Sequence, residues 1–159
     1  MNEKREKCDE CETTYDAAYY GDKECLEICV AYNCPLHQET TRVAASRGHK
    51  SILEYCVMNN FPWHPETTYY AAQYGHKECL EICVKNNCTW DPVTTLSAAM
   101  NGDKEILEYI FENCKDFVSW EESKLEEHMD EYSKEIQEYV LSVKDEWQWY
   151  SKRCQDIKG

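Results

Sequence analysis

At 159 residues the chain is long enough for one domain with a sizeable core, and 17 Lys and Arg against 31 Asp and Glu give a formal net charge of −14. That charge would repel a phosphate backbone over most of the surface, which argues against nucleic acid as the main ligand. Eleven cysteines occur without an apolar secretory signal or any apolar stretch of about 18 residues. We therefore expect free thiols in a reducing, intracellular, cytoplasmic compartment and no membrane binding.

The main feature of the sequence is a segment of the form Thr-Thr-x-x-Ala-Ala-x-x-Gly that occurs four times. The four copies start at Thr13, Thr40, Thr67 and Thr94, and each start lies 27 residues after the last. A fixed period of this size is typical of repeat proteins, in which each unit is too small to bury its own apolar face and packs on its neighbours. We predict repeats over residues 12–118, after a polar segment 1–11 and before a C-terminal extension 119–159.

Each repeat is predicted to form a helix, a turn and a second helix. Pro65 and Pro92 suit the first position of a helix, where a missing N–H costs nothing, and Asp91 suits the N-cap. The alanine pair allows neighbouring helices to approach closely. A glycine follows where the first helix must end in a left-handed residue, at Gly21, Gly48, Gly75 and Gly102.

The second helix of each repeat has apolar residues at i, i+1, i+4 and i+5, which form one broad buried stripe. In chain order these are Cys25, Leu26, Cys29 and Val30; Ile52, Leu53, Cys56 and Val57; Cys79, Leu80, Cys83 and Val84; Ile106, Leu107, Ile110 and Phe111. The cysteines in these stripes are expected to serve as small core residues, because Ile takes equivalent places in other repeats.

Three further sets of residues are expected at the helix boundaries. The polar caps that open the second helices are Asp22, His49, His76 and Asp103. The left-handed residues near the ends of the first three are Asn33, Asn60 and Asn87. The staples that precede the next helix and stack in a ladder are Leu36, Trp63, Trp90 and Phe117.

Residues 119–159 do not follow the repeat. No Gly or Pro lies between Gly102 and Gly159, and Ser119-Trp120-Glu121-Glu122 has the form of a capping box, so a long helix is predicted from about residue 120. Its apolar residues follow a heptad-like spacing, at Leu125, Met129, Tyr132, Ile136, Tyr139, Val143, Trp147 and Tyr150. The segment is either a divergent fifth unit or cap, or a dimer-forming helix with Tyr139, Val143, Trp147 and Tyr150 as its interface.

The Gly75-His76 dipeptide after an alanine pair, with Asn86-Asn87-Cys88-Thr89-Trp90-Asp91 before the next helix, resembles ankyrin repeats. The chain is most similar to the short 27-residue ankyrin-like arrays of giant DNA viruses and protists, over about residues 10 to 120. It departs from the common pattern in two ways: Glu66-Thr67-Thr68-Tyr69 replaces Thr-Pro-Leu-His, and the period is shorter than about 33 residues. The resemblance implies an all-α ankyrin-like solenoid without β-hairpin fingers, a viral or protist origin, and protein–protein binding, for a viral protein to a host partner.

Catalytic and metal-binding patterns are weak in this sequence. Cys8 and Cys11 form one metal-like pair, whereas a structural zinc site uses four ligands. His49 and His76 align with Asp22 and Asp103, which favours a capping role over a catalytic base. No Gly-rich phosphate loop, Gly-x-Ser-x-Gly or His-Glu-x-x-His occurs. We expect no enzyme activity, no cofactor and no metal.

Positions that vary between repeats on the first helix are the candidates for partner binding. Tyr supplies rigid amphipathic contact area, and Arg is enriched at interface hot spots. The predicted binding residues are Tyr15, Tyr19, Tyr20, Arg42, Arg47, Tyr69, Gln73, Tyr74, Met100 and Asn101. The sequence thus predicts a non-enzymatic, adapter-type interaction module that binds another protein through its first helices. The alternative is a structural or assembly protein that forms a homodimer through its C-terminal helix.

Overall fold

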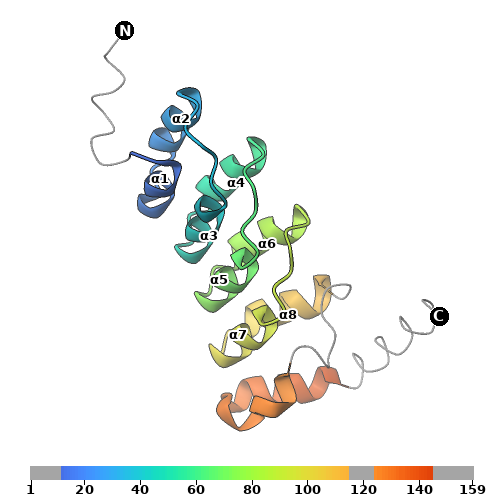
Figure 1. The fold of residues 1–159 in the computed structure, drawn as a ribbon. Coiled ribbons are helices and arrows are strands. Elements are labelled where there is room, and N and C mark those ends of the chain that lie inside the picture. The colour runs from blue at the N-terminus through green and yellow to red at the C-terminus, as the bar shows by residue number, and fades with distance from the viewer. Residues whose placement is uncertain (1–11, 115–123, 145–159) are drawn as a thin grey trace, which may run out of the picture. The chain divides into compact units, whose positions relative to one another are not determined.

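A computed structural model of the chain describes residues 12–114 and 124–144. The described residues form helices, turns and connecting segments, with no strand among them, which confirms the all-α prediction for this part of the chain. The chain divides into two compact units, residues 1–91 and 92–159, which are described separately (Figure 1). The predicted boundary between residues 118 and 119 lies outside the described residues.

The described part of the first unit consists of three helix pairs that pack in two layers (Figure 1). The helices are α1 (Thr14–Tyr20), α2 (Lys23–Ala31), α3 (Gln38–Ser46), α4 (Lys50–Met58), α5 (Thr67–Gln73) and α6 (Lys77–Lys85). Helix α3 packs between α1 and α5, and α4 packs between α2 and α6. Each first helix also packs on the second helix of its own pair. Successive pairs therefore stack through both layers.

The predicted turns are confirmed at every repeat. The glycine after each first helix has a positive φ, from 71° to 73°. Asn33, Asn60 and Asn87 also have positive φ, between 52° and 57°. Asparagine tolerates this region better than most side chains, and glycine enters it without a Cβ penalty. These two turns per repeat set the direction in which each next helix starts.

The starts of the first helices differ from the prediction. Helix α5 begins at Thr67 with Glu66 as its N-cap, so Pro65 precedes the helix and does not occupy its first position. The N–H of Thr67 donates to the carbonyl of His64 over 3.1 Å. Pro65 is therefore the second residue of a turn, where its fixed φ is favourable. In the second unit α7 begins at Thr94 after Val93, so Pro92 and Asp91 also lie before the cap.

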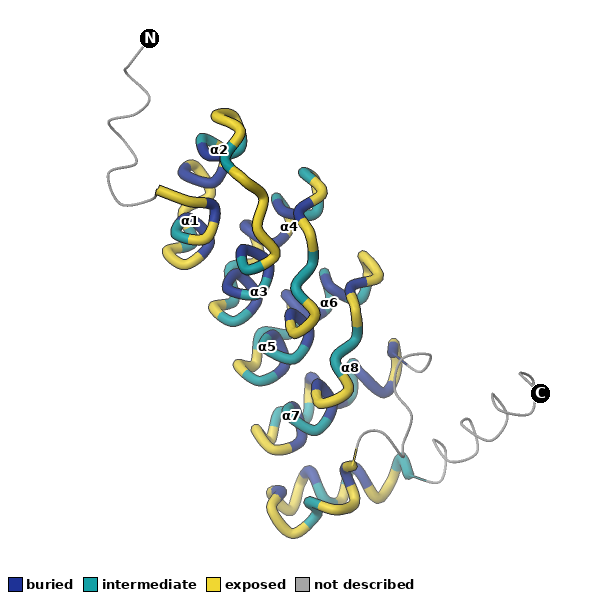
Figure 2. The backbone as a smooth tube through the Cα atoms, viewed as in Figure 1, coloured by how far each residue is buried: buried dark blue, intermediate teal, exposed yellow. Residues whose placement is uncertain are grey.

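The core includes the alanine pairs, the threonine pairs except for the exposed Thr13, and most of the predicted stripes of the second helices (Figure 2). All four alanine pairs have no exposed surface. The first three residues of each stripe are buried, as expected. In the fourth place Phe111 is buried, while Val30, Val57 and Val84 are only half-buried. Of the predicted staples, Leu36 is 38% exposed and Trp63 and Trp90 are half-buried. Phe117 lies outside the described residues, and the stacking of these side chains in a ladder stays a prediction.

The second threonine of each pair in the first unit holds the connection to the next repeat. The hydroxyl oxygens of Thr14, Thr41 and Thr68 lie 3.2, 3.3 and 3.4 Å from the carbonyl oxygens of Pro35, Pro62 and Thr89, each 21 residues further along. The Thr41 hydroxyl donates its proton to the closer carbonyl of Gln38 over 2.7 Å and accepts from the N–H of His64 over 3.1 Å. The repeated Thr-Thr therefore anchors each connecting segment on the preceding first helix.

We expect Thr41→Val to lower the free energy of unfolding by about 1–3 kcal/mol, because it leaves the N–H of His64 without its acceptor in a half-buried connection. Thr40→Val is the matched control. Thr40 is equally buried, yet its hydroxyl has a single contact, 3.0 Å from that of Thr14, which keeps its bond to Pro35. Urea unfolding followed by circular dichroism compares the two. Equal losses would contradict the anchoring role of Thr41.

In the second unit the described helices are α7 (Thr94–Met100), α8 (Lys104–Asn113), the 3-10 helix η2 (Leu125–Glu131) and residues 134–144, which are also helical. The predicted long helix is wrong within residues 124–144. Lys124 has a left-handed φ of 50° and Tyr132 is extended, so both ends of η2 interrupt a continuous helix. The side-chain amide of Gln137 donates to the carbonyls of Met129 and Tyr132, which replaces the bonds that a continuous helix would make.

The tail contains a recognisable second helix of a further repeat. Ser-Lys-Glu-Ile-Gln-Glu-Tyr-Val at 133–140 aligns with Asp-Lys-Glu-Ile-Leu-Glu-Tyr-Ile at 103–110, a spacing of 30 residues. The N–H of Ile136 lies 3.4 Å from the hydroxyl of Ser133, much as the N–H of Ile106 donates to Asp103. Ile136 and Val140 have no exposed surface. This supports the divergent fifth unit, with three extra residues in its first half.

Candidate partner-binding surface

The predicted binding residues of the first unit lie along α1, α3 and α5 and the turns that follow them; we call this the first-helix face. Tyr15, Tyr20 and Tyr74 are 36%, 60% and 54% exposed, and Tyr19 and Arg47 are also exposed. Arg42, Tyr69 and Gln73 are half-buried, and burial is the main cause that raises the pKa of Tyr69. Met100 and Asn101 are exposed at the end of α7 in the second unit.

Arg47 is stacked on an aromatic cluster from the preceding repeat. Its guanidinium carbon lies 3.5 Å from the ring centroid of Tyr19. Tyr19 in turn stacks with Tyr15 at 6.3 Å and meets Tyr20 edge to face at 5.2 Å. A cation held over a tyrosine face is attracted by the ring quadrupole. The contact therefore fixes Arg47 at the surface with its N–H edges still available.

Arg42 belongs to a second cluster in which its charge is already paired. Its Nε lies 2.6 Å from a carboxylate oxygen of Glu39, and its guanidinium lies 5.2 Å from the ring of Tyr70. Partial burial acts to lower the pKa of Arg42, but the hydrogen bond and charge of Glu39 raise it overall. The other oxygen of Glu39 lies 3.3 Å from His64 Nε2. Arg42 is therefore engaged inside the chain, unlike Arg47.

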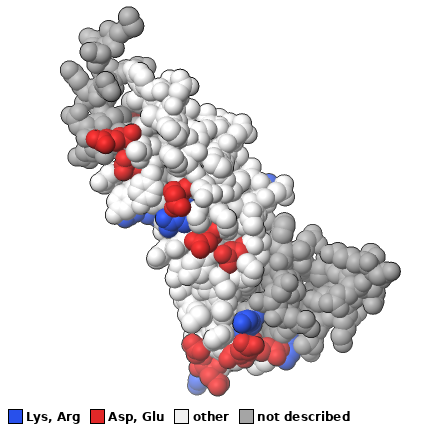
Figure 3. Space-filling model, in the orientation of Figure 1, with Lys and Arg blue, Asp and Glu red and all other residues white. Residues whose placement is uncertain are grey.

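A small open hollow lies on the first-helix face, lined by Ser46, Arg47, His49 and Tyr74, with a volume of about 420 Å³. Tyr74 stacks on Tyr70 with ring centroids 6.1 Å apart and an interplanar angle of 8°. One face of its ring is thus covered, while more than half of the residue remains exposed. The hollow joins residues of two successive repeats. On the side of the molecule shown in Figure 3, the acidic and basic side chains of the described residues form small separate groups among other residues.

His49 takes part in this hollow, although the sequence predicts only a capping role for it. His49 and His76 occupy the N-cap positions of α4 and α6 as expected, but neither makes a side-chain capping hydrogen bond. Their rings lie against the glycines of the preceding repeat instead: a Cβ on Gly21 would lie 2.7 Å from the ring of His49. This packing crosses the repeat boundary, so the pattern within one repeat does not reveal it.

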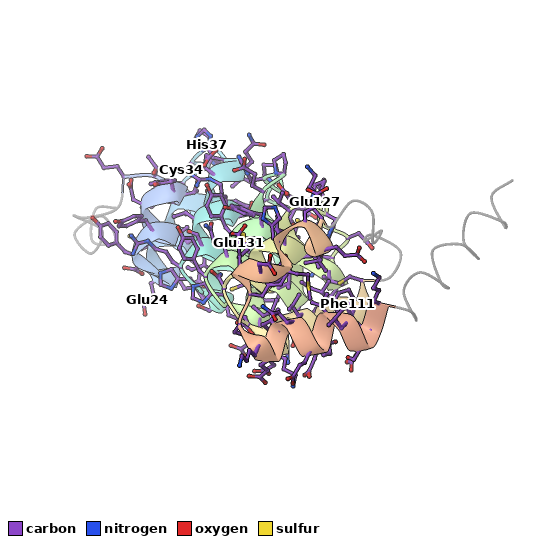
Figure 4. All side chains as sticks on the ribbon, turned by 90° about the horizontal axis from the view of Figure 1, so that it is seen from below. Glu24, Cys34, His37, Phe111, Glu127 and Glu131 are labelled. Carbon is purple, nitrogen blue, oxygen red and sulfur yellow. The ribbon has the colours of Figure 1, made fainter. Side chains whose placement is uncertain are left out.

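The predicted oligomer interface is only partly described. Tyr139 and Val143 are half-buried, and Trp147 and Tyr150 lie outside the described residues. The ring of Tyr139 lies 5.9 Å from that of Phe111, and the amine of Lys104 lies 6.0 Å from its centroid. Glu127 and Glu131 lie on η2 in the same unit (Figure 4). Tyr139 therefore packs within its own chain.

Four of the buried cysteines have thiols with a raised pKa. Burial raises the pKa of the thiols of Cys56, Cys79 and Cys114 to about 12. A hydrogen bond with Cys88, together with burial, raises the pKa of Cys83. These thiols stay protonated near neutral pH, and the thiolate is the form that attacks or binds metals.

The described residues contain no group of three or more His, Cys, Asp or Glu side chains that could hold a metal ion; Cys8 and Cys11 lie outside this part. Among them, no helix combines the length and the apolar character needed to cross a membrane.

Comparisons of the chain with protein-family models, with curated proteins and with solved structures gave no match. The interpretation of the first-helix face therefore depends on the residues and their geometry.

Proposed function

We propose that the chain is a non-enzymatic, adapter-type interaction module with an ankyrin-like repeat fold, and that it binds a protein partner through the first-helix face. The observation that carries this proposal is the set of exposed aromatic and arginine side chains held in fixed positions on successive repeats. Arg47 is held by Tyr19, and Tyr74 is held by Tyr70. Side chains that are ordered before binding lose less entropy when a partner is captured.

The composition of the face agrees with this function. Tyr and Arg dominate the energetic centres of protein interfaces, because they bury a large area and also form hydrogen bonds. The stacked helix pairs repeat the same face at regular intervals, which provides an extended surface for a macromolecule. The hollow of about 420 Å³ is open to solvent and is small compared with the whole face. A partner protein therefore matches the face better than a small substrate does.

We expect the double variant Arg47→Ala/Tyr74→Ala to weaken partner binding about a hundredfold or more, since each residue type is a common hot spot. The partner is first captured from a lysate, identified, and purified, and its affinity is then measured by calorimetry. Tyr69 is left unchanged because it is half-buried.

The matched control is Tyr32→Ala/Met58→Ala, which removes two exposed apolar side chains at the ends of α2 and α4. We expect this control to bind within about twofold of the unchanged chain. Circular dichroism must show equal helix content in both variants, and light scattering must show equal mass. Undiminished binding by the Arg47/Tyr74 variant, or an equal loss in the control, would refute the proposed face.

A further inference from the structure

Arg47 supplies hydrogen-bond donors at the hollow, and the neighbouring backbone carbonyls at the end of α3 already accept hydrogen bonds. At the end of α3 the carbonyls of Val43, Ala44 and Ala45 accept from the N–H groups of Arg47, His49 and Gly48. The Ser46 hydroxyl donates to the carbonyl of Val43 over 2.9 Å. The guanidinium of Arg47 carries five N–H donors, and the ring of Tyr19 covers only its flat face. A ligand for this place needs hydrogen-bond acceptors.

Arg47 also places one positive charge at the hollow, on a chain whose overall charge is strongly negative. Within the described residues Arg47 makes no ion pair, whereas Arg42 is paired with Glu39 and Lys50 with Glu78. The carboxylate of Asp16, on the neighbouring helix α1, already accepts from the N–H and hydroxyl of Thr13. Glu39 lies eight residues before Arg47, roughly 12 Å along α3. Among the described residues, no carboxylate therefore forms an ion pair with Arg47.

We propose that the hollow binds an aspartate or glutamate side chain of an acidic segment in the protein partner. The carboxylate accepts two N–H bonds from the edge of the Arg47 guanidinium, a geometry that arginine favours. The methylene groups of the bound aspartate or glutamate, or the next side chain of the partner's segment, pack on the exposed part of the Tyr74 ring. The volume of about 420 Å³ lies near the lower end of the range for small-ligand pockets, which suits one or two side chains and not a folded domain. This inference rests on the proposed function and gives the partner its chemistry.

The test uses the full chain and a hexaglutamate peptide with blocked ends, measured by calorimetry near physiological salt. Hexaglutamine is the uncharged peptide control. Because the chain carries a net charge of −14, general electrostatics oppose binding of hexaglutamate, so a measured affinity reports a local site. We expect hexaglutamate to bind more tightly than hexaglutamine. We expect Arg47→Gln to weaken hexaglutamate binding about tenfold or more.

Lys85→Gln is the matched variant, since it also removes one positive charge, on helix α6 outside the first-helix face, at a place already paired with Glu81. We expect it to change hexaglutamate binding by less than about threefold. Equal binding of the two peptides, or equal losses in Arg47→Gln and Lys85→Gln, would overturn the proposal. Inorganic phosphate that displaces the peptide at equal concentration would also overturn it, in favour of a phosphate site. So would a dimer in light scattering that Arg47→Gln abolishes, because a second copy would then occupy the hollow.

The outcome separates this inference from the proposed function. If the purified partner binds and the Arg47/Tyr74 variant abolishes that binding, but hexaglutamate does not bind, the face is correct and the acidic chemistry is wrong. If hexaglutamate binds through Arg47 but the partner does not depend on the face, the site exists and the proposed function fails.

Discussion

Gly48→Ala is expected to destabilise the first unit through both its backbone conformation and a clash with the next repeat. Gly48 has a φ of 71°, and forcing an alanine into the left-handed region costs about 1–2 kcal/mol. The added Cβ would also lie 2.6 Å from Nδ1 of His76 and 3.0 Å from its Cγ, so the ring of the next repeat must shift. Such overpacking costs about another 1–3 kcal/mol. Urea unfolding followed by circular dichroism measures the sum.

Two controls separate the backbone cost from the clash. Gly102 has a φ of 72°, and no described atom lies within 4 Å of a Cβ built there, so Gly102→Ala carries the backbone cost alone. In a His76→Ala background the clash is gone, and Gly48→Ala should again cost only about 1–2 kcal/mol. If the loss in Gly48→Ala equals that in Gly102→Ala, or survives unchanged in the His76→Ala background, the ring is not what requires the glycine.

The parts of the fold that the sequence predicts correctly depend on local chemistry that recurs in register. The positive φ of Gly48 and Asn60 could be predicted because it concerns a single residue at a time. The same residue type also recurs at the matching position, Gly in four repeats and Asn in three. The buried stripes follow from helical periodicity alone. Pro65 was misplaced because a turn from His64 to Thr67 suits proline as well as a helix start does.

The tail was harder to predict because its determinants are not local. The spacing of 30 residues between Asp103 and Ser133 conceals the alignment when a period of 27 is imposed. The break after η2 depends on Gln137, whose amide reaches back to Met129 eight residues earlier. The heptad-like spacing of apolar residues therefore predicted a continuous helix, whereas the chain leaves the helical conformation at Tyr132.

The candidate site was likewise predicted correctly where its determinants are local and was missed where they are not. The choice of Tyr19, Arg47 and Tyr74 followed from comparing repeats, and the structure shows all three at the surface of the first unit. Whether they bind a partner stays a prediction. The role of His49 was missed, because its ring packs on Gly21 of the preceding repeat and lines the hollow only after the pairs have stacked. The contact between His49 and Gly21 depends on how successive helix pairs pack, which the sequence of one repeat does not show.

Leu53→Ala is expected to lower the free energy of unfolding by about 2–5 kcal/mol. Leu53 has no exposed surface and lies on α4, the helix that packs between α2 and α6. Truncation removes the transfer free energy of its methyl groups and leaves a cavity in the core. Met58→Ala on the same helix is the control, since Met58 is 78% exposed and should change stability by less than about 0.5 kcal/mol.

The same pair of variants tests whether the binding face depends on the second layer. Helix α3, which precedes Arg47, packs on α4, so loosening α4 should also loosen the hollow. At a urea concentration where Leu53→Ala is half unfolded and Met58→Ala is not, we expect the leucine variant to lose both helix signal and hexaglutamate binding in one transition, because stacked units unfold together when their interfaces are strong. Loss of binding well before loss of helix signal would instead show that the first-helix layer opens independently of the second.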